Sequence, residues 1–247
     1  MTHSAAPSTL RRLGDAGWLA LIGGGEFSFE ETELADAAWL AKVDPESAVG
    51  FLPAASGSED YASHFSVYLD EYFERRCQVL PIYRARDARR GKNAERVDGF
   101  GSVYVGGGVA DHLVTALAGT PSLDALARVL ERGGAVAAIA AGAQALGMRC
   151  RSLFGGKMLD GLGWLPGGVV ETNFDPPGSK PNFDKRLRRL LGQSTVEWGL
   201  GIPAGSAVLI GPDGSYEVQG QAWYLGSADG ELVELMSPDP LLAEIKV

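Results

Sequence analysis

Short apolar segments that end in glycine-rich turns recur along the chain, and residues with helical periodicity follow them. Trp18 to Ile22 runs into Gly23-Gly24-Gly25, and Ser102 to Val105 runs into Gly106-Gly107-Gly108. These segments lack the polar alternation of a half-exposed strand, so they are typical of strands buried on both faces. Because helices separate them, the strands are expected to pair in parallel through right-handed crossovers. The pattern predicts a three-layer α/β/α sandwich with a mostly parallel sheet.

Apolar periodicity predicts the remaining elements. Further strands are expected at residues 48–53, 77–83 and 135–139, and helices at residues 30–41, 61–75, 111–117, 123–132 and 183–191. From residue 207 onward, short β segments are separated by hairpin signals such as Gly211-Pro212-Asp213-Gly214. We expect these last strands to be antiparallel and to cap one edge of the sheet. An N-terminal tail, residues 1–16, is expected to precede a single domain over residues 17–247.

Charge and composition limit the classes of partner. The chain has 247 residues, of which 45% are hydrophobic, and this is enough for one compact core. Its net charge of −9 argues against a nucleic-acid partner, because phosphate binding needs a basic surface. The basic segment at residues 84–92 has the composition of a solvated loop or helix face.

Cysteine usage and hydropathy limit the remaining options. Cys77 and Cys150 lie far apart and match no metal-ligand spacing, so neither a metal site nor another cofactor is predicted. Unpaired cysteines of this kind favour a reducing compartment. The sequence has no apolar segment close to the roughly 18 residues that a membrane span requires, and its first residues lack the apolar core of a signal peptide. We therefore expect a cytoplasmic protein without a membrane partner.

The most distinctive segment is residues 133–147, which reads as a buried strand, a tight turn and a helix. This order of elements is what a nucleophile elbow requires, because the sharp turn lifts one side chain above the sheet beside the N–H groups of the helix. The residue at the apex is Ala140. A methyl group cannot attack a carbonyl, so this position cannot supply a nucleophile.

Seven blocks in the same order give the chain a resemblance to a known family. It resembles the dipeptidase E and cyanophycinase family of serine peptidases, and the resemblance implies the class I glutamine amidotransferase-like fold. The blocks are IGGGE at residues 22–26, FLPAASG at 51–57, YVGGG at 104–108, AAGAQALG at 140–147, GLGWLPGGVVETNF at 161–174, the helix with Arg186 and Arg188, and GLGIPAGSAVLI at 199–210.

The resemblance also shows where the chain departs from the family's catalytic pattern. Ala140 occupies the position of the nucleophilic serine, and Asn173 that of the histidine that precedes an aromatic residue. Residues 149–158, where the dipeptidase branch has its third triad residue, contain no carboxylate, and an Asp-Glu pair common among cyanophycinases is replaced by Pro203-Ala204. Because the triad acts as a unit, the resemblance implies a homologue without the Ser-His pair.

The resemblance leaves a set of candidate ligand-binding residues. These are Glu26, the oxyanion-hole parts Gly107, Gly108 and the Ala141 N–H, and Asn173. They could bind a small peptide, an amino acid or another carboxylate without reacting with it. Each also has a purely structural interpretation: glycines permit tight turns, an acid is favoured at a helix N-terminus, and an asparagine can cap a loop.

Two other function classes stay open at this point. One is an active hydrolase that uses non-standard groups such as Ser28, Glu26 or His112, with His64 as a further base. The other is a structural or regulatory subunit in which the elbow is only packed core. A homodimer is compatible with either class. Arg186 and Arg188 are expected to make structural ion pairs on their helix.

Overall fold

The computed structural model describes residues 6–154 and 156–237. The strands of its main sheet are β1 (Trp18–Ile22), β2 (Val49–Leu52), β3 (Cys77–Val79), β4 (Ser102–Val105), β5 (Ala135–Ile139), β10 (Ala207–Ile210) and β11 (Tyr216–Gln219). Within the described residues their order is β11-β10-β1-β5-β4-β2-β3. The five strands from β1 to β3 run parallel, and β10 pairs with β1 antiparallel. The predicted mostly parallel sheet is confirmed.

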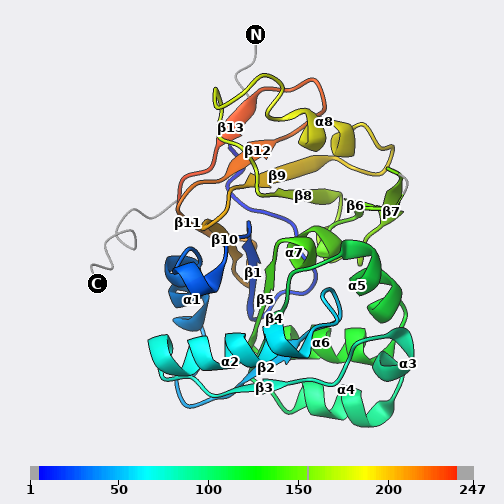
Figure 1. Ribbon diagram of the computed structural model, residues 1–247. Coiled ribbons are helices and arrows are strands. Elements are labelled where there is room, and N and C mark those ends of the chain that lie inside the picture. The colour runs from blue at the N-terminus through cyan, green and yellow to red at the C-terminus, as the bar shows by residue number, and fades with distance from the viewer. Residues whose placement is uncertain (1–5, 155, 238–247) are drawn as a thin grey trace.

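Helices cover both faces of this sheet (Figure 1). They are α1 (Glu33–Leu40), α2 (Glu59–Phe73), α3 (Ala85–Ala88), α4 (Gly91–Asp98), α5 (Ala110–Leu117), α6 (Pro121–Glu131) and α7 (Ala141–Leu146). Because strand side chains alternate between faces, Leu19 and Leu21 of β1 pack in the cluster that includes α4, α5 and α6 residues. Ala20 and Ile22 pack instead with α1 and α2. The three-layer sandwich follows from this alternation.

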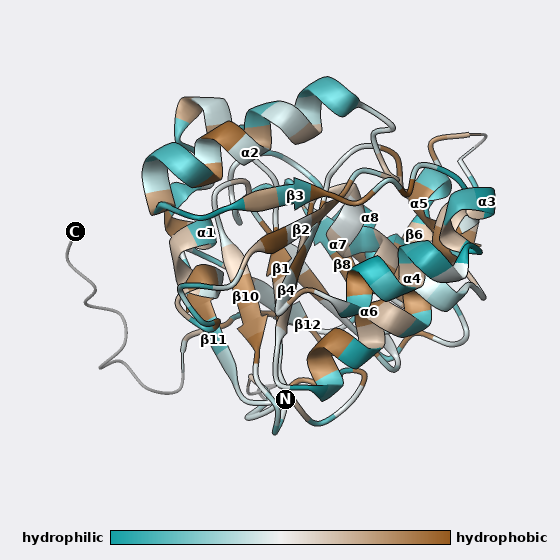
Figure 2. Cartoon of the chain, turned by 90° about the horizontal axis from the view of Figure 1, so that it is seen from below, coloured by the Kyte–Doolittle hydropathy of each residue, from teal (hydrophilic) through white to brown (hydrophobic). Residues whose placement is uncertain are grey.

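Figure 2 shows the same division by hydropathy: the strands at the centre are largely brown, whereas the outward parts of α2 and α4 are teal. Helix α6 begins where the sequence provides its start signals. The Thr120 side chain accepts a hydrogen bond from the Leu123 N–H, and Pro121 occupies the first turn, where its missing N–H is not needed.

A second sheet lies above the carboxyl end of the main sheet in Figure 1. It contains β8 (Gly168–Thr172), β9 (Trp198–Ile202), β12 (Trp223–Leu225) and β13 (Leu232–Glu234), in the order β13-β12-β9-β8. Helix α8 (Lys185–Leu191) packs on it, and its leucines join a small core with Val169 and Leu225. A two-stranded hairpin of β6 (Arg149–Arg151) and β7 (Met158–Asp160) stands beside it.

The antiparallel strands after residue 207 therefore divide between two sheets. Strands β10 and β11 form one edge of the main sheet, in agreement with the expected cap. Strands β12 and β13 instead extend the second sheet, β12 pairing with β9. Trp223 explains this choice, because its buried ring packs 5.6 Å from the Phe174 ring, between centroids, in the core of that sheet.

The basic segment at residues 84–92 forms α3 and the start of α4. Asp87 lies within it at 3.5 Å from Arg86 and 3.9 Å from Arg90, so part of the positive charge of the segment is offset locally.

The strand expected at residues 77–83 ends at Val79, because Pro81 has no N–H to donate to the sheet. The helix expected at residue 30 begins at Glu33, after a 3-10 turn at Phe27–Phe29 that ends with Glu30 in the left-handed region (φ 62°).

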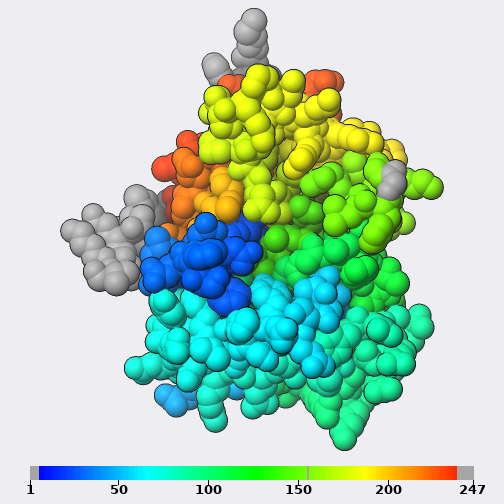
Figure 3. Space-filling view, in the orientation of Figure 1, coloured from blue at the N-terminus to red at the C-terminus, as the bar shows by residue number. Residues whose placement is uncertain are grey.

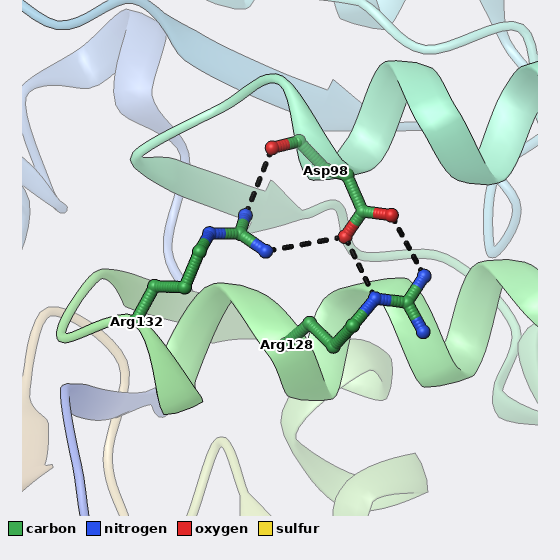
Figure 4. Close-up of polar contacts among 3 residues, drawn as sticks. All are labelled: Asp98, Arg128 and Arg132. Atoms are coloured by element: carbon green, nitrogen blue, oxygen red, sulfur yellow. Dashed lines mark hydrogen bonds and ion pairs between the residues drawn. The ribbon is translucent and has the colours of Figure 1, made fainter.

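An ion cluster joins α4 to α6 at the end of the sheet opposite the second sheet. Arg128 donates two hydrogen bonds, of 3.0 and 2.7 Å, to the Asp98 carboxylate. Arg132 donates one of 3.2 Å to that carboxylate and one of 2.9 Å to the Asp98 carbonyl (Figure 4). Bidentate guanidinium geometry makes this a stronger contact than an ordinary surface ion pair. The arginines also lower the pKa of Asp98 through these hydrogen bonds.

Residues 6–16, for which the sequence predicts a tail, lie against the domain. Leu10 is 3% exposed and its N–H donates to the Gly214 carbonyl at 2.7 Å. The buried Arg12 guanidinium donates to the carbonyls of Gly211 and Gly17.

Among the described residues no single helix is long and apolar enough to cross a membrane. Helices α5 and α6 reach that length and hydropathy only together, across a 94° bend.

Candidate functional site

The link between β5 and α7 has the backbone geometry of a nucleophile elbow. Ala140 has φ 50° and ψ −116°, a conformation that residues with a Cβ rarely adopt. Its N–H donates to the Ile22 carbonyl of β1 at 2.9 Å, and its carbonyl accepts from the Gln144 N–H of α7 at 3.0 Å. The turn is therefore held from both sides, although its side chain is only a methyl group.

A cavity of about 460 Å³ opens above this turn, at the carboxyl ends of the strands. Four of the five residues proposed from the sequence line it, namely Glu26, Gly107, Gly108 and Asn173, together with Ala140. The fifth, Ala141, is nearly covered, with 9% of its surface exposed. As the first residue of α7, its N–H lies outside the hydrogen-bond ladder of that helix. In Figure 3 the blue, cyan and green segments that contribute to this region meet near the middle of the view.

Two of the three glycines that follow β4, Gly107 and Gly108, have different structural roles. Gly108 has φ +142°, and a Cβ there would lie 2.5 Å from the Ala55 backbone, so glycine is required by the fold. A Cβ on Gly107 would meet nothing closer than 3.6 Å, and the nearest side-chain atom is the Ala140 Cβ. The protein itself therefore does not require a glycine at position 107, where a side chain would project beside the elbow.

Asn173 closes the cavity on the side of the second sheet. It has a left-handed backbone (φ 48°), which asparagine tolerates better than most residues, and its N–H donates to the Gly23 carbonyl at 2.7 Å. Its side-chain amide lies directly over Gly24, because a Cβ there would be 2.5 Å from Oδ1. Ala204, at a position where the resembling family often has a carboxylate, lies on the same wall.

The cavity is also lined by Tyr61, Ser56 and Glu31, which are not among the residues predicted from the sequence. Ser58 caps α2 by accepting a hydrogen bond from the Tyr61 N–H at 3.1 Å, which fixes Tyr61 in the first turn of the helix. Burial raises the pKa of the Tyr61 hydroxyl to about 12, while a hydrogen bond from the Gly107 backbone acts in the opposite direction. The position of Tyr61 could have been predicted from the sequence, because a helix that follows a parallel strand begins at the edge of the sheet where sites form.

The charge of this cavity is negative. Glu26 and Glu31 lie on its wall, and the Glu26 N–H donates to the Glu31 carboxylate at 2.8 Å. None of its lining residues is a lysine, arginine or histidine. The arrangement can bind a cation or hydrogen-bond donors through carboxylate, phenol and amide oxygens. Its lining residues include no imidazole, and the residue at the apex of the elbow is an alanine.

The groups considered for a non-standard hydrolase are brought together only in part, because Ser28, His64 and Glu26 share a cavity that does not include His112. His112 lies in a separate cavity of about 800 Å³ beside Arg84 and Phe154. Ser28 and His64 line a third cavity, of about 650 Å³, along α2. Of the groups considered, Glu26 alone also lines the cavity above Ala140, where Phe27 and Tyr61 form part of the shared wall.

The other residues named from the sequence have structural partners. Arg188 donates to Asp184 at 2.6 Å and to the carbonyls of Ala228 and Gly230, as expected of a structural arginine. Arg186 lies 3.9 Å from the buried Glu171. Burial raises the pKa of the Cys150 thiol to about 12. In residues 6–154 and 156–237 there is no cluster of three or more potential metal ligands.

The fold and the elbow define a serine-peptidase-like α/β protein. The family model of peptidase family S51 matches residues 19–217, and the chain belongs to this family. The structure is similar to the crystal structure of a peptidase from an acI-B1 Actinobacterium, with 20% identity, a TM-score of 0.69, and coverage of 92% of this chain and 97% of that one.

It is also similar to a protein assigned to peptidase E from Listeria monocytogenes EGD-e, with 15% identity and a TM-score of 0.58, over 82% of this chain and 98% of that one. At these identities both structures support the fold alone. No curated protein matches the chain.

Proposed function

We propose that the chain is a non-catalytic member of peptidase family S51 that binds a small peptide or an amino acid in the cavity above Ala140. The observation that carries this proposal is a methyl group at the apex of a fully formed elbow, facing a cavity of about 460 Å³. Cavities of this size are in the range that proteins use for small ligands. The apex carries no hydroxyl and no imidazole lines the cavity, and both observations support a non-catalytic role.

The negative charge of the cavity favours the amino end of such a ligand. The carboxylates of Glu26 and Glu31 favour an ammonium group, and a free carboxylate would have to approach both of them. The sequence-based proposal of a carboxylate at the Ala141 N–H therefore has less support than binding of the amino end of a peptide. The Asn173 amide remains as a hydrogen-bonding group for neutral parts of the ligand, whereas the Gly107 backbone already hydrogen-bonds the Tyr61 hydroxyl.

A thermal-shift screen with amino acids and dipeptides tests the proposal. A ligand at 100 times its Kd stabilises the folded state by about 2.7 kcal/mol, and N-acetylated versions of the same compounds should have little effect. In parallel, the protein should not hydrolyse Asp-X dipeptides or β-Asp-Arg substrates, and a fluorophosphonate should not label it. Turnover above a heat-denatured control, lost in Glu26→Gln, would contradict the non-catalytic assignment.

One observation supports the alternative of an active hydrolase. Ser28, His64 and Glu26 line the same cavity of about 650 Å³. A serine, a base and a carboxylate are the components of nucleophilic catalysis. If turnover is found, this alternative requires that Ser28→Ala abolish it and that Ala140→Gly leave it unchanged.

A further inference from the structure

We infer that the cavity above Ala140 is the middle of a longer groove, and that its occupant is an extended peptide segment with basic side chains. This inference rests on the proposed function, because it describes the ligand of the same site. A single amino acid would use only the middle cavity, whereas an extended segment would also use the two that adjoin it.

Shared walls connect the three cavities. Ser56 lines both the middle cavity and the one that contains His112. Glu26, Phe27 and Tyr61 line both the middle cavity and the one along α2. All three therefore open around the loops that follow β1 and β2, which is the edge where ligands of parallel α/β sheets bind.

The third cavity follows one stripe of α2. Tyr61, His64, Tyr68 and Tyr72 line it at spacings of three and four residues, so they lie on one side of the helix. From Tyr61 to Tyr72 the helix rises about 16 Å, at 1.5 Å per residue. An extended peptide covers that distance with about five residues, at 3.3–3.6 Å each.

Exposed carboxylates accompany this groove. Glu26 and Glu31 lie in its middle, and Glu71 lies near the end of the α2 stripe. Glu59 lies in the cavity that contains His112. The exposed Tyr72 ring at the end of the α2 stripe adds a face on which a lysine or arginine side chain can lie. The positive charges of the cavity that contains His112 are partly compensated, since Arg86 is paired with Asp87. A segment with basic side chains complements this charge, and an acidic segment does not.

A binding assay with three synthetic peptides tests the inference. The probes are the dipeptide Lys-Ala, the hexapeptide Lys-Ala-Lys-Ala-Lys-Ala and the hexapeptide Glu-Ala-Glu-Ala-Glu-Ala, measured by calorimetry at low salt. We expect the lysine hexapeptide to bind at least tenfold more tightly than the dipeptide and the glutamate hexapeptide not to bind. Its affinity should fall with ionic strength.

Two variants on α2 locate the effect. Glu71→Gln removes a carboxylate that lines only the α2 cavity, and Asp70→Asn removes its exposed neighbour, which lines none of the three. Glu71→Gln should weaken the hexapeptide several-fold and leave Lys-Ala unchanged, while Asp70→Asn changes neither.

Equal affinities of the dipeptide and the lysine hexapeptide would contradict the inference that the ligand occupies a longer groove. Equal effects of the two variants would contradict it as well. In that case binding of Lys-Ala that is lost in Gly107→Ala would still support the proposed function. If none of the three probes binds, the groove is overturned, and the proposed function fails only if the thermal-shift screen with amino acids and dipeptides is also negative.

Discussion

The Tyr68 hydroxyl of α2 donates a 3.0 Å hydrogen bond to the carboxylate of Asp36 in α1. The Trp39 indole N–H donates to the same carboxylate at 2.9 Å, and Asp36 is fully buried. Burial raises the pKa of Asp36 to about 6, and these hydrogen bonds counteract only part of the rise. We therefore expect the packing of α1 against α2, the helix that lines the third cavity, to depend on pH.

We predict that this carboxylate makes folding stability fall as the pH rises from 4 to 6. Above its unfolded pKa of 3.8 the unfolded chain releases the proton first, so the loss grows until the pH passes the folded pKa. The two values correspond to a loss of about 3 kcal/mol. Urea unfolding between pH 4 and 7 should show this slope, and Asp36→Asn should remove it. Glu33→Gln, on the same helix, is the control, and equal slopes for both variants would refute the assignment.

Ala140→Ser alone should restore no hydrolysis. A hydroxyl at the apex would have no imidazole among the residues that line its cavity, and loss of the base from a triad removes on the order of 10⁶-fold of the rate. Labelling by a fluorophosphonate and cleavage of Asp-X dipeptides are the measurements. Labelling of this single variant would mean that another residue already acts as a base.

Substitutions of Gly107 and Gly108, which follow β4, form a matched pair. Gly107→Ala should leave the melting temperature within a few degrees of the wild type, because its Cβ has 3.6 Å of space, but should weaken ligand binding by narrowing the cavity. Gly108→Ala should destabilise the fold by about 2 kcal/mol or more, because of its positive φ and the 2.5 Å approach to Ala55. Thermal unfolding and calorimetry separate the two effects, and unchanged binding in Gly107→Ala would speak against a ligand beside the elbow.

Ala140→Gly should stabilise the protein. The backbone at this position (φ 50°, ψ −116°) is strained for alanine and accessible to glycine, and relief of such strain is worth on the order of 1–3 kcal/mol. Glycine also increases the entropy of the unfolded chain, which offsets about 0.5–1 kcal/mol of the gain. We therefore expect a net gain of about 1 kcal/mol in urea unfolding. Ala143→Gly, inside α7, should lower stability and serves as the control.

Sequence patterns predicted the main sheet well. The strands expected at residues 102–105 and 135–139 match β4 and β5, because each is a largely apolar segment that begins directly after a glycine. The second sheet was harder to predict. Its β9 contains Gly199 and Gly201, which weaken a strand signal, and both are explained only by packing: a Cβ at Gly201 would lie 2.7 Å from the Phe174 ring.

The candidate site was predictable in part for a similar reason. Glu26, Gly107 and Asn173 follow strands directly, so the topology of a parallel sheet places them at one edge. Tyr61 was missed because its position depends on the Ser58 cap, and a tyrosine at the start of an apolar helix stripe reads as core. The separation of His112 from the elbow depends on how the loops fold, which local spacing does not specify.

The elbow of this protein keeps its shape in the absence of the atom that the shape is known for presenting. Its torsion angles are imposed by hydrogen bonds to β1 and α7 and do not depend on a hydroxyl at the apex. A search that relies on the nucleophile's sequence signature would pass over such a chain. A search for the backbone torsions themselves, at the end of a buried parallel strand, would recover members of a lineage with and without that hydroxyl. Main-chain geometry is thus a record of ancestry that does not depend on the side chain at the apex.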